Sequence, residues 1–353
     1  MIKKHKVCIL TNEFEDDHQL WLKTLEANSE LVDISLINLT SNDWLNSVLI
    51  SDAEVFIARP PGLSDQSKHL YDERLYIIAN TLKNRLYPSF EEVLVYENKK
   101  FLSYFLKANN IPHPKTDVFY SKDEALQFCQ KTKYPIVAKF NIGASGSGVR
   151  ILKTKEKAIE YVNQSFSGSG APKRWGPNLE KGNLFKRGIH YLFNPGDIFK
   201  KLSLYKKKKA TKQIGYLILQ EYIEHSFEWR CVRIGDSFFA HKKLKIGEKA
   251  SGTLLKGYEN PPLEIFDFVK EITDRVNFSS LAIDIFETDN GLYLVNEMQC
   301  YFGQSDVFQM MVNNRIGRYR FIDGAWIFEE GDYAKNACYD LRLLHLLEIL
   351  KKR

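Results

Sequence analysis

Short apolar runs alternate with amphipathic stretches along the N-terminal part of the chain. Strands that alternate with helices favour a parallel sheet covered by helices, so we expect a small parallel α/β domain over residues 1–95. The predicted strands and helices span, in chain order, residues 6–10, 19–27, 31–39, 55–58 and 65–83. Ligands of such sheets gather where the strands end. Arg59 follows the third strand, so it is a candidate to bind a substrate anion; the alternative is an exposed arginine in a turn.

A second alternation of strands and helices follows, and we expect a second domain over residues 96–353. Residues 115–215 predict a lid subdomain with a glycine-rich loop. Residues 216–353 predict a subdomain that ends in a hairpin and a helix from Ala334. Residues 163–213 are rich in glycine, proline, lysine and asparagine and lack periodicity, which is typical of loops. The fold class is therefore α/β, with an α+β second domain.

Two apolar strands in the second domain are joined by Asn290-Gly291, a strong signal for a β-hairpin. A two-residue turn at this point places Asp289 opposite Leu292. The same register places Asp284 opposite Glu297, with the two Cβ atoms roughly 4.5–5.5 Å apart. Two carboxylates held this close repel each other unless a cation lies between them.

The face that carries these two acids predicts a metal site. Gln299 projects from the same face as Glu297, because side chains alternate along a strand. Two carboxylates and an amide oxygen suit a hard divalent cation such as Mg²⁺. The alternative is a solvated polar face on an edge hairpin, which the apolar remainder of both strands disfavours.

A second tight hairpin turns at Gly235-Asp236. Its register pairs Arg230 with His241 and Glu228 with Lys243, and all four side chains share one face. Facing charged groups between apolar strands predict the floor of a polar pocket. The alternative is a solvent-facing ladder of ion pairs, each of which contributes little.

A glycine-rich loop follows a short apolar strand that ends in Lys139. Glycines at short intervals let backbone N–H groups turn toward an anion such as a phosphate. The loop alone is a weak signal and is not the GxxxxGK[ST] motif, but the lysine before it strengthens the phosphate interpretation. The candidate loop residues are Gly143, Ser145, Gly146, Ser147 and Gly148.

The charge and composition exclude several classes of protein. The chain has 353 residues, 44% of them hydrophobic, and a net charge of +6. Seven lysines between residues 200 and 212 exceed that whole surplus, so the positive charge is local and nucleic-acid binding is not expected. The first apolar run is too short for a signal peptide or a membrane span, which favours a cytoplasmic protein. Five scattered cysteines without CxxC argue against zinc or a disulfide framework.

The order of these motifs resembles the ATP-grasp superfamily, whose members include D-alanine–D-alanine ligase, glutathione synthetase and the glutamate ligase that modifies a ribosomal protein. The resemblance spans roughly residues 95–305. It implies an ATP-grasp fold preceded by a small parallel α/β domain.

The resemblance implies an ATP site. Lys99 and Lys139 match the two nucleotide-binding lysines of the family, and the glycine-rich loop matches the segment that closes over the phosphates. Glu228 matches the acid that holds the ribose hydroxyls. The segment that reads adenine through backbone groups matches Gln220, Glu221, Tyr222 and Ile223.

The resemblance also assigns the metal ligands to Asp284, Glu297 and Gln299, for two Mg²⁺ ions, with Mn²⁺ as an alternative. The family usually has asparagine where this chain has Gln299. It also has a loop of small residues where this chain has two bulky aromatics, which puts a familiar substrate in doubt. The candidate catalytic residues are Arg230 and Lys243, and the candidate substrate-binding residues are Arg59 and Arg233.

These roles together imply an ADP-forming carbon–nitrogen ligase. A small-molecule or peptide carboxylate takes the γ-phosphoryl group of ATP, and an amine then attacks the acyl phosphate. The alternatives are a kinase that stops at phosphoryl transfer and a nucleotide-binding protein without catalysis. Homodimers are common in the family.

Overall fold

The chain forms two compact units in the computed structural model, which describes residues 3–62, 64–143, 148–172, 212–246, 249–250 and 255–352. The first unit comprises Met1–Pro61, Gln66–His113 and Glu224–Arg353. The second comprises Gly62–Asp65 and Pro114–Ile223. The expected domain division near residue 95 stays a prediction. No helix in the described ranges is long and apolar enough to cross a membrane.

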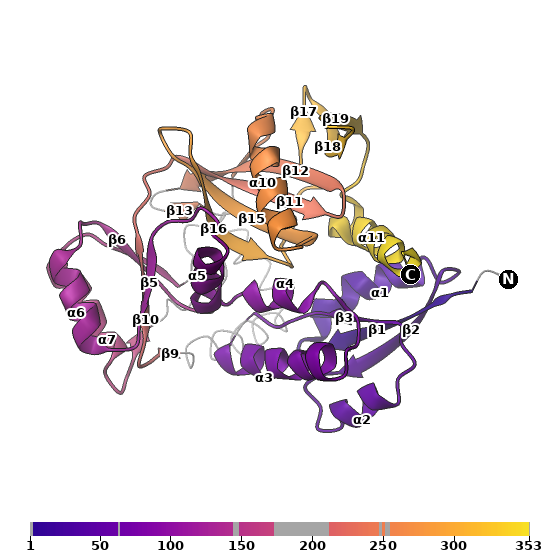
Figure 1. The fold of residues 1–353 in the computed structure, drawn as a ribbon, viewed down its shortest axis with the longest axis horizontal. Helices are drawn as coiled ribbons and strands as arrows, with labels where there is room; N and C mark the ends of the chain where they lie inside the picture. Colours follow the sequence, from indigo (N-terminus) through magenta and orange to yellow (C-terminus); the bar gives the residue numbers. More distant parts are fainter. Residues whose placement is uncertain are drawn as a thin grey trace, which may run out of the picture. The chain divides into compact units, whose positions relative to one another are not determined.

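The first unit contains a four-stranded parallel sheet in the order β2-β1-β3-β4. Figure 1 labels its strands β1, β2 and β3. The parallel α/β arrangement expected from the sequence is confirmed. Its strands are β1 (His5–Thr11), β2 (Val32–Asn38), β3 (Val55–Ala58) and β4 (Leu86–Tyr87). Its helices are α1 (Gln19–Glu26), α2 (Trp44–Leu49), α3 (Asp65–Tyr76) and α4 (Phe90–Val95).

The C-terminal helix α11 (Tyr339–Lys351) returns to this parallel sheet. Leu343 and Leu346 of α11 belong to the same buried core as Val7 and Ile9 of β1. The helix expected from Ala334 is confirmed, although its α-helical part begins at Tyr339. The two ends of the described chain therefore share one hydrophobic core.

The first unit also contains a nine-stranded antiparallel sheet. Its main path runs β16-β15-β11-β12-β18-β17, with β13 (Lys249–Ala250) and β14 paired to β12 and β19 paired to β18. Helices α5 (Lys99–Ala108) and α10 (Leu263–Arg275) contribute to its buried core. The strands that matter for function are β11 (Phe227–Ile234), β12 (Ser237–Ile246), β14 (Lys256–Gly257), β15 (Ser280–Glu287) and β16 (Tyr293–Gln299). The expected C-terminal hairpin is formed by β18 (Arg315–Ile322) and β19 (Ala325–Glu330), and β17 (Met311–Val312) precedes it.

The second unit is built on a four-stranded sheet in the order β5-β10-β6-β7. Residues of helices α6 and α7 share a buried core with this sheet. The elements are β5 (Thr116–Phe119), α6 (Lys122–Lys131), β6 (Ile136–Lys139), β7 (Val149–Leu152), α7 (Lys155–Ser165) and β10 (Leu217–Glu221). A short ladder joins β8 (Ala171–Pro172) to β9 (Lys212–Gln213). Most of the stretch expected to form loops, with the lysine run except Lys212, lies outside the described residues.

Candidate active site

Charged side chains line one face of four adjacent strands in the antiparallel sheet of the first unit. Cross-strand pairing places one residue from each strand in a single row, and a second pair of charges lies in the next row. Three of the pairs predicted from the two hairpin registers are confirmed: Arg230 with His241, Glu228 with Lys243, and Asp284 with Glu297. The row contains His241, Arg230, Asp284 and Glu297, and the neighbouring pair is Glu228 and Lys243.

The turn that was expected to set the Asp284–Glu297 pair differs from the prediction. Thr288 rather than Asp289 lies opposite Leu292: the Thr288 N–H donates to the Leu292 carbonyl at 3.0 Å. The loop is therefore one residue longer, with Gly291 at φ +76°. A bulge at Asn296 then shifts the register back, because Ile285 pairs with Val295 while Asp284 pairs with Glu297.

Asp284 is the centre of the charged face and is only 2% exposed. Arg230 donates to both of its oxygens, from Nε to Oδ1 at 2.8 Å and from Nη2 to Oδ2 at 2.9 Å. Lys243 Nζ donates to Oδ2 at 2.7 Å. Burial raises the pKa of Asp284, but the charges of Arg230 and Lys243 outweigh it and hold that pKa well below its usual range.

Lys243 joins Asp284 to a second buried acid. Its Nζ also donates to Glu228 Oε2 at 2.7 Å, and Asn296 Nδ2 donates to Glu228 Oε1 at 3.3 Å. Burial lowers the pKa of Lys243, but the charges of Asp284 and Glu228 raise it by more. The net effect is a raised pKa, so the ammonium stays charged. Glu228 and Lys243 are both buried, and the alternative of a solvent-facing ladder is therefore wrong.

Lys99 brings a further cation to the end of the row. Asn98 caps helix α5 by accepting a hydrogen bond from the Phe101 N–H at 3.3 Å, which fixes Lys99 at the first helical position. Lys99 Nζ lies 3.1 Å from Glu297 Oε1 and 3.6 Å from Glu97 Oε2. Burial lowers the pKa of Lys99, but these two acids outweigh it and the pKa is raised.

The predicted metal ligands lie on this same face. Gln299 pairs with Ala282, two positions from the Asp284–Glu297 pair, so its side chain shares the face of Glu297. Two carboxylates and an amide oxygen fit a hard cation such as Mg²⁺. The Glu297 side chain is 20% exposed and remains accessible. Among the described residues no group of three or more His, Cys, Asp or Glu could hold a metal.

The second unit contains the candidate phosphate-binding segment. Lys139 ends strand β6 and is buried. The Phe140 N–H donates to the Gly148 carbonyl at 2.8 Å and closes the base of the glycine-rich loop. A Cβ at Gly148 would lie 2.6 Å from Phe140 Cβ, so this position requires glycine. Gly143 is buried. The remaining loop candidates, Ser145, Gly146 and Ser147, lie outside the described residues.

The predicted adenine-reading segment comprises the last two residues of β10, Gln220 and Glu221, and the two residues after it. Gln220 Nε2 donates to Thr116 Oγ1 at 2.9 Å, and Glu221 Oε1 accepts from the Lys115 N–H at 2.7 Å. Both side chains thus fasten β10 to the start of β5. Adenine contacts from Tyr222 and Ile223 stay a prediction.

Arg59 lies at the carboxyl end of β3, as the sequence indicates. Its Nη2 is 3.3 Å from Asp17 Oδ1, and its guanidinium lies 4.6 Å from the centre of the Tyr301 ring. Tyr301 is buried and donates from its hydroxyl to the Ala58 carbonyl at 2.6 Å. One of the two bulky aromatics after Gln299 therefore fixes the C-terminal segment to the parallel sheet. A substrate role for Arg59 stays a prediction.

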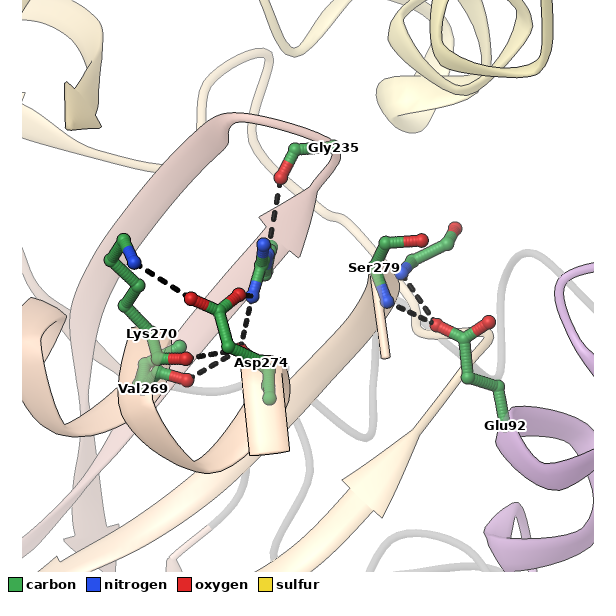
Figure 2. Close-up of polar contacts among 9 residues, drawn as sticks. Glu92, Gly235, Val269, Lys270, Asp274 and Ser279 are labelled. Atoms are coloured by element: carbon green, nitrogen blue, oxygen red, sulfur yellow. Dashed lines mark hydrogen bonds and ion pairs between the residues drawn. The ribbon is translucent and has the colours of Figure 1, made fainter. Parts of the chain in front are cut away.

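Arg233 does not join the charged face, because it lies three residues from Arg230 and points to the opposite side of β11. Its Nη1 donates to Thr273 Oγ1 at 2.6 Å and to Asp274 Oδ1 at 2.5 Å. Figure 2 shows Asp274 between this guanidinium and Lys270, which donates to Asp274 Oδ2 at 2.7 Å. The structure thus separates Arg233 from the other candidates.

Sequence reasoning missed an extension of the charged face beyond β12. Lys256 pairs with Lys243 across β14 and β12, and it donates to Asp306 Oδ2 at 2.6 Å. The Tyr258 hydroxyl donates to the same oxygen at 2.7 Å. Strand β14 is two residues long and too short for a periodic pattern; the i, i+2 spacing of Lys256 and Tyr258 is its only signal.

Comparison with known families identifies part of this chain. Residues 97–173 match the family described as phosphoribosylglycinamide synthetase, ATP-grasp (A) domain. The chain is similar to alpha-aminoadipate–LysW ligase LysX of Saccharolobus solfataricus, with 29% identity over 36% of this chain and 44% of the relative. It is also similar to phosphoribosylamine–glycine ligase of Halalkalibacterium halodurans, with 35% identity over 24% of this chain and 21% of the relative. The chain therefore spans less than half the length of these curated relatives.

Solved structures extend the likeness to the whole chain. D-alanine–D-alanine ligase from Bacillus anthracis matches with a TM-score of 0.53 and 12% identity, over 99% of both chains. The N5-carboxyaminoimidazole synthetase from Staphylococcus aureus complexed with ADP matches with a TM-score of 0.52 and 10% identity, over 85% of this chain and 72% of that chain. At such identities the likeness concerns the fold, and it confirms the fold class expected from the motifs.

Proposed function

We propose that this chain, which has the ATP-grasp fold, is an ATP- and Mg²⁺-dependent carboxylate–amine ligase that forms ADP. One observation carries the proposal: Asp284, Glu297 and Gln299 share a sheet face with buried Arg230 and Lys243. Buried ion pairs of this kind are weak contributors to stability. Their charges suit the phosphoryl group that such an enzyme must bind.

The three oxygen-bearing residues of this face would hold the magnesium. When bound, Mg²⁺ neutralises part of the charge of the ATP phosphates. Both oxygens of Asp284 already accept hydrogen bonds from cations. Glu297, whose side chain is 20% exposed and pairs with Lys99, would bind the metal together with Asp284 and Gln299.

The cations of the same face would stabilise the transferred phosphoryl group. The substrate carboxylate attacks the γ-phosphorus, and the bond from that phosphorus to the bridging oxygen breaks to release ADP. Arg230, Lys243 and Lys99 offset the negative charge that concentrates there. By the resemblance, Lys139 is a further candidate to bind the ATP phosphates. The amine nitrogen then attacks the acyl carbon, phosphate leaves, and the amine loses its proton to water.

The resemblance implies further residues for the nucleotide. The glycine-rich segment that begins at Gly143 and ends at Gly148 is the candidate to bind the phosphates. Glu228 receives the ribose hydroxyls. Arg59 is the candidate for the carboxylate substrate, because ligands of parallel sheets gather at the carboxyl ends of the strands. Arg233 is left out of the proposed site.

The experiment is a panel of amino acids and sugar acids assayed for ADP release, with products identified by mass spectrometry. We expect ADP release that needs a carboxylate, an amine and Mg²⁺ together. The Glu297→Gln variant should lower turnover by about 100-fold or more, the effect of losing one group that stabilises a transition state.

The control for Glu297→Gln is Glu329→Gln, which removes an acid that pairs with Arg318 and Arg320 on the C-terminal hairpin. It should leave turnover unchanged. Formation of ADP and a phosphorylated product without an amine would instead identify a kinase. ATP binding without ADP release across the whole panel would contradict both enzymatic functions.

A further inference from the structure

We propose that His241 and Asp306 form the subsite of the amine substrate, where both accept hydrogen bonds from its N–H groups. This inference rests on the proposed ligase function and deepens it. The two residues lie next to Arg230 on the side away from the metal ligands: His241 pairs with Arg230, and Asp306 is joined to His241 through Tyr258.

The hydrogen bonding of His241 fixes its ring as an acceptor. Nδ1 lies 2.8 Å from the Gln309 carbonyl, which can only accept, so Nδ1 carries the proton. Burial and then the charge of Arg230 lower the pKa of His241 to about 3, so the ring is neutral. Nε2 therefore presents a lone pair.

That lone pair has no donor among the residues that the structure describes. His241 is only 1% exposed, and Nε2 is buried without a hydrogen-bond partner among the described residues. A buried acceptor without a partner is destabilising by about 1–3 kcal/mol. A donor supplied by a bound substrate would satisfy it, and the N–H of an amine is such a donor.

Asp306 offers a second acceptor nearby. Its three donors all reach Oδ2: Lys256 Nζ at 2.6 Å, the Tyr258 hydroxyl at 2.7 Å and Ser305 Oγ at 3.4 Å. Within the described part of the chain Oδ1 has no donor, and the side chain is 41% exposed. A carboxylate oxygen at an accessible rim is suited to attract an ammonium group.

Tyr258 connects the two acceptors. Its ring centre lies 5.5 Å from that of His241, while its hydroxyl is bonded to Asp306. In the proposed reaction the ammonium first binds Asp306 at the rim and releases one proton to water. The neutral amine then donates an N–H to Nε2 of His241, next to Arg230, and its lone pair is free to attack the acyl phosphate.

Two substitutions at His241 distinguish the hydrogen-bonding roles of Nδ1 and Nε2. In His241→Asn the amide nitrogen replaces Nδ1 and keeps the bond to Gln309, but the acceptor at Nε2 is lost. In His241→Gln the longer amide places an oxygen near Nε2 and restores the acceptor. The probe is the amino acid that gives the fastest ADP release with the wild-type chain.

We expect His241→Asn to raise the KM for that amino acid about 2- to 13-fold, the effect of one hydrogen bond. His241→Gln should restore a KM close to wild type. Asp306→Asn should raise it about 10- to 150-fold, because the lost bond is to a charged group. The KM for ATP and for the carboxylate should not change in any of these variants.

A matched control is Glu259→Gln. Glu259 pairs with Lys242, which lies against the Phe227 ring on the other face of β12, so this variant should leave the KM for the amino acid unchanged. An unchanged KM in both His241→Asn and Asp306→Asn, with normal turnover by the wild type, overturns the subsite alone. No ADP release by the wild type with any pair in the panel overturns the ligase function and the subsite with it.

Discussion

Two arginines of strand β11 have opposite surroundings although only two residues separate them. Arg230 is 9% exposed and donates to both oxygens of Asp284, which is itself buried. Arg233 donates to Asp274, whose side chain is 42% exposed. One arginine lies inside a network of buried charges, and the other belongs to an ion-pair group at the edge of helix α10 (Figure 2).

The difference separates a structural ion pair from a candidate functional one. The Arg233 side chain is 12% exposed, about as buried as that of Arg230, but its partner Asp274 is 42% exposed. A pair with an exposed acid contributes little and needs no special explanation. Burying charges requires their desolvation, and apolar residues of similar volume often stabilise a fold equally well or better. The retention of Glu228, Arg230, Lys243 and Asp284 in the sheet interior therefore points to a use other than stability.

The largest loss of unfolding free energy is expected from Arg230→Met. The change leaves Asp284 buried with Lys243 as its only cation, and removal of one partner from a buried pair is destabilising by about 3–5 kcal/mol. Urea unfolding monitored by circular dichroism measures the free energy of unfolding. A loss below about 1 kcal/mol would mean that Arg230 behaves like a surface residue.

Asp284→Asn tests the same network through activity. The amide keeps the shape of the side chain but removes the charge that orients Arg230 and Lys243 and that would help to hold the metal. We expect turnover to fall by about 100- to 1,000-fold or more. The measurement is ADP release at saturating ATP, with circular dichroism as the control for folding. Turnover within a factor of about two of wild type would leave the metal assignment without support.

The lowered pKa of His241 makes the free energy of unfolding depend on pH. Its pKa is about 3 in the folded chain against an ordinary value of 6.5. Between these values the unfolded chain binds a proton that the folded chain does not. The contribution of neutral His241 to the free energy of unfolding is therefore complete above pH 6.5. It is lost as the pH falls toward 3, by up to about 1.4 kcal/mol per pH unit. His241→Asn should show a shallower decline of unfolding free energy over this range; equal slopes would contradict a neutral, buried ring.

The smallest effect is expected at the other arginine. Arg233→Met removes a pair in which Asp274 keeps Lys270 as a partner. The free energy of unfolding should fall by about 1 kcal/mol or less, and ADP release should not change. A large loss of turnover in this variant, with the fold intact, would show that both faces of β11 serve the reaction and would end the contrast between them.

The two hairpins show how far sequence can predict this site. The Gly235-Asp236 turn has the expected two residues, so the Arg230–His241 and Glu228–Lys243 pairs follow from counting alone. The Asn290-Gly291 turn is one residue longer than expected, yet the Asp284–Glu297 pair is correct because the bulge at Asn296 compensates. Bulges depend on the packing of the whole sheet, and no local sequence pattern predicts them.

Other parts of the site lay beyond sequence reasoning for a different reason. Lys256, Tyr258 and Asp306 meet through a two-residue strand and an irregular segment, where neither periodicity nor turn chemistry fixes the contacts. Arg233 is a candidate substrate-binding residue in the sequence, and strand alternation places it on the other face of β11 from Arg230. A substrate role for Arg233 stays a prediction.

In the proposed reaction, the buried charged face activates a carboxylate through an acyl phosphate. The most direct test uses the carboxylate that gives the fastest ADP release, labelled with ¹⁸O in its carboxyl group, together with its amine partner. Transfer through an acyl phosphate moves a carboxylate oxygen into the released phosphate, so the account predicts phosphate that carries a single ¹⁸O by mass spectrometry. Unlabelled phosphate from a reaction that still forms the amide would contradict it.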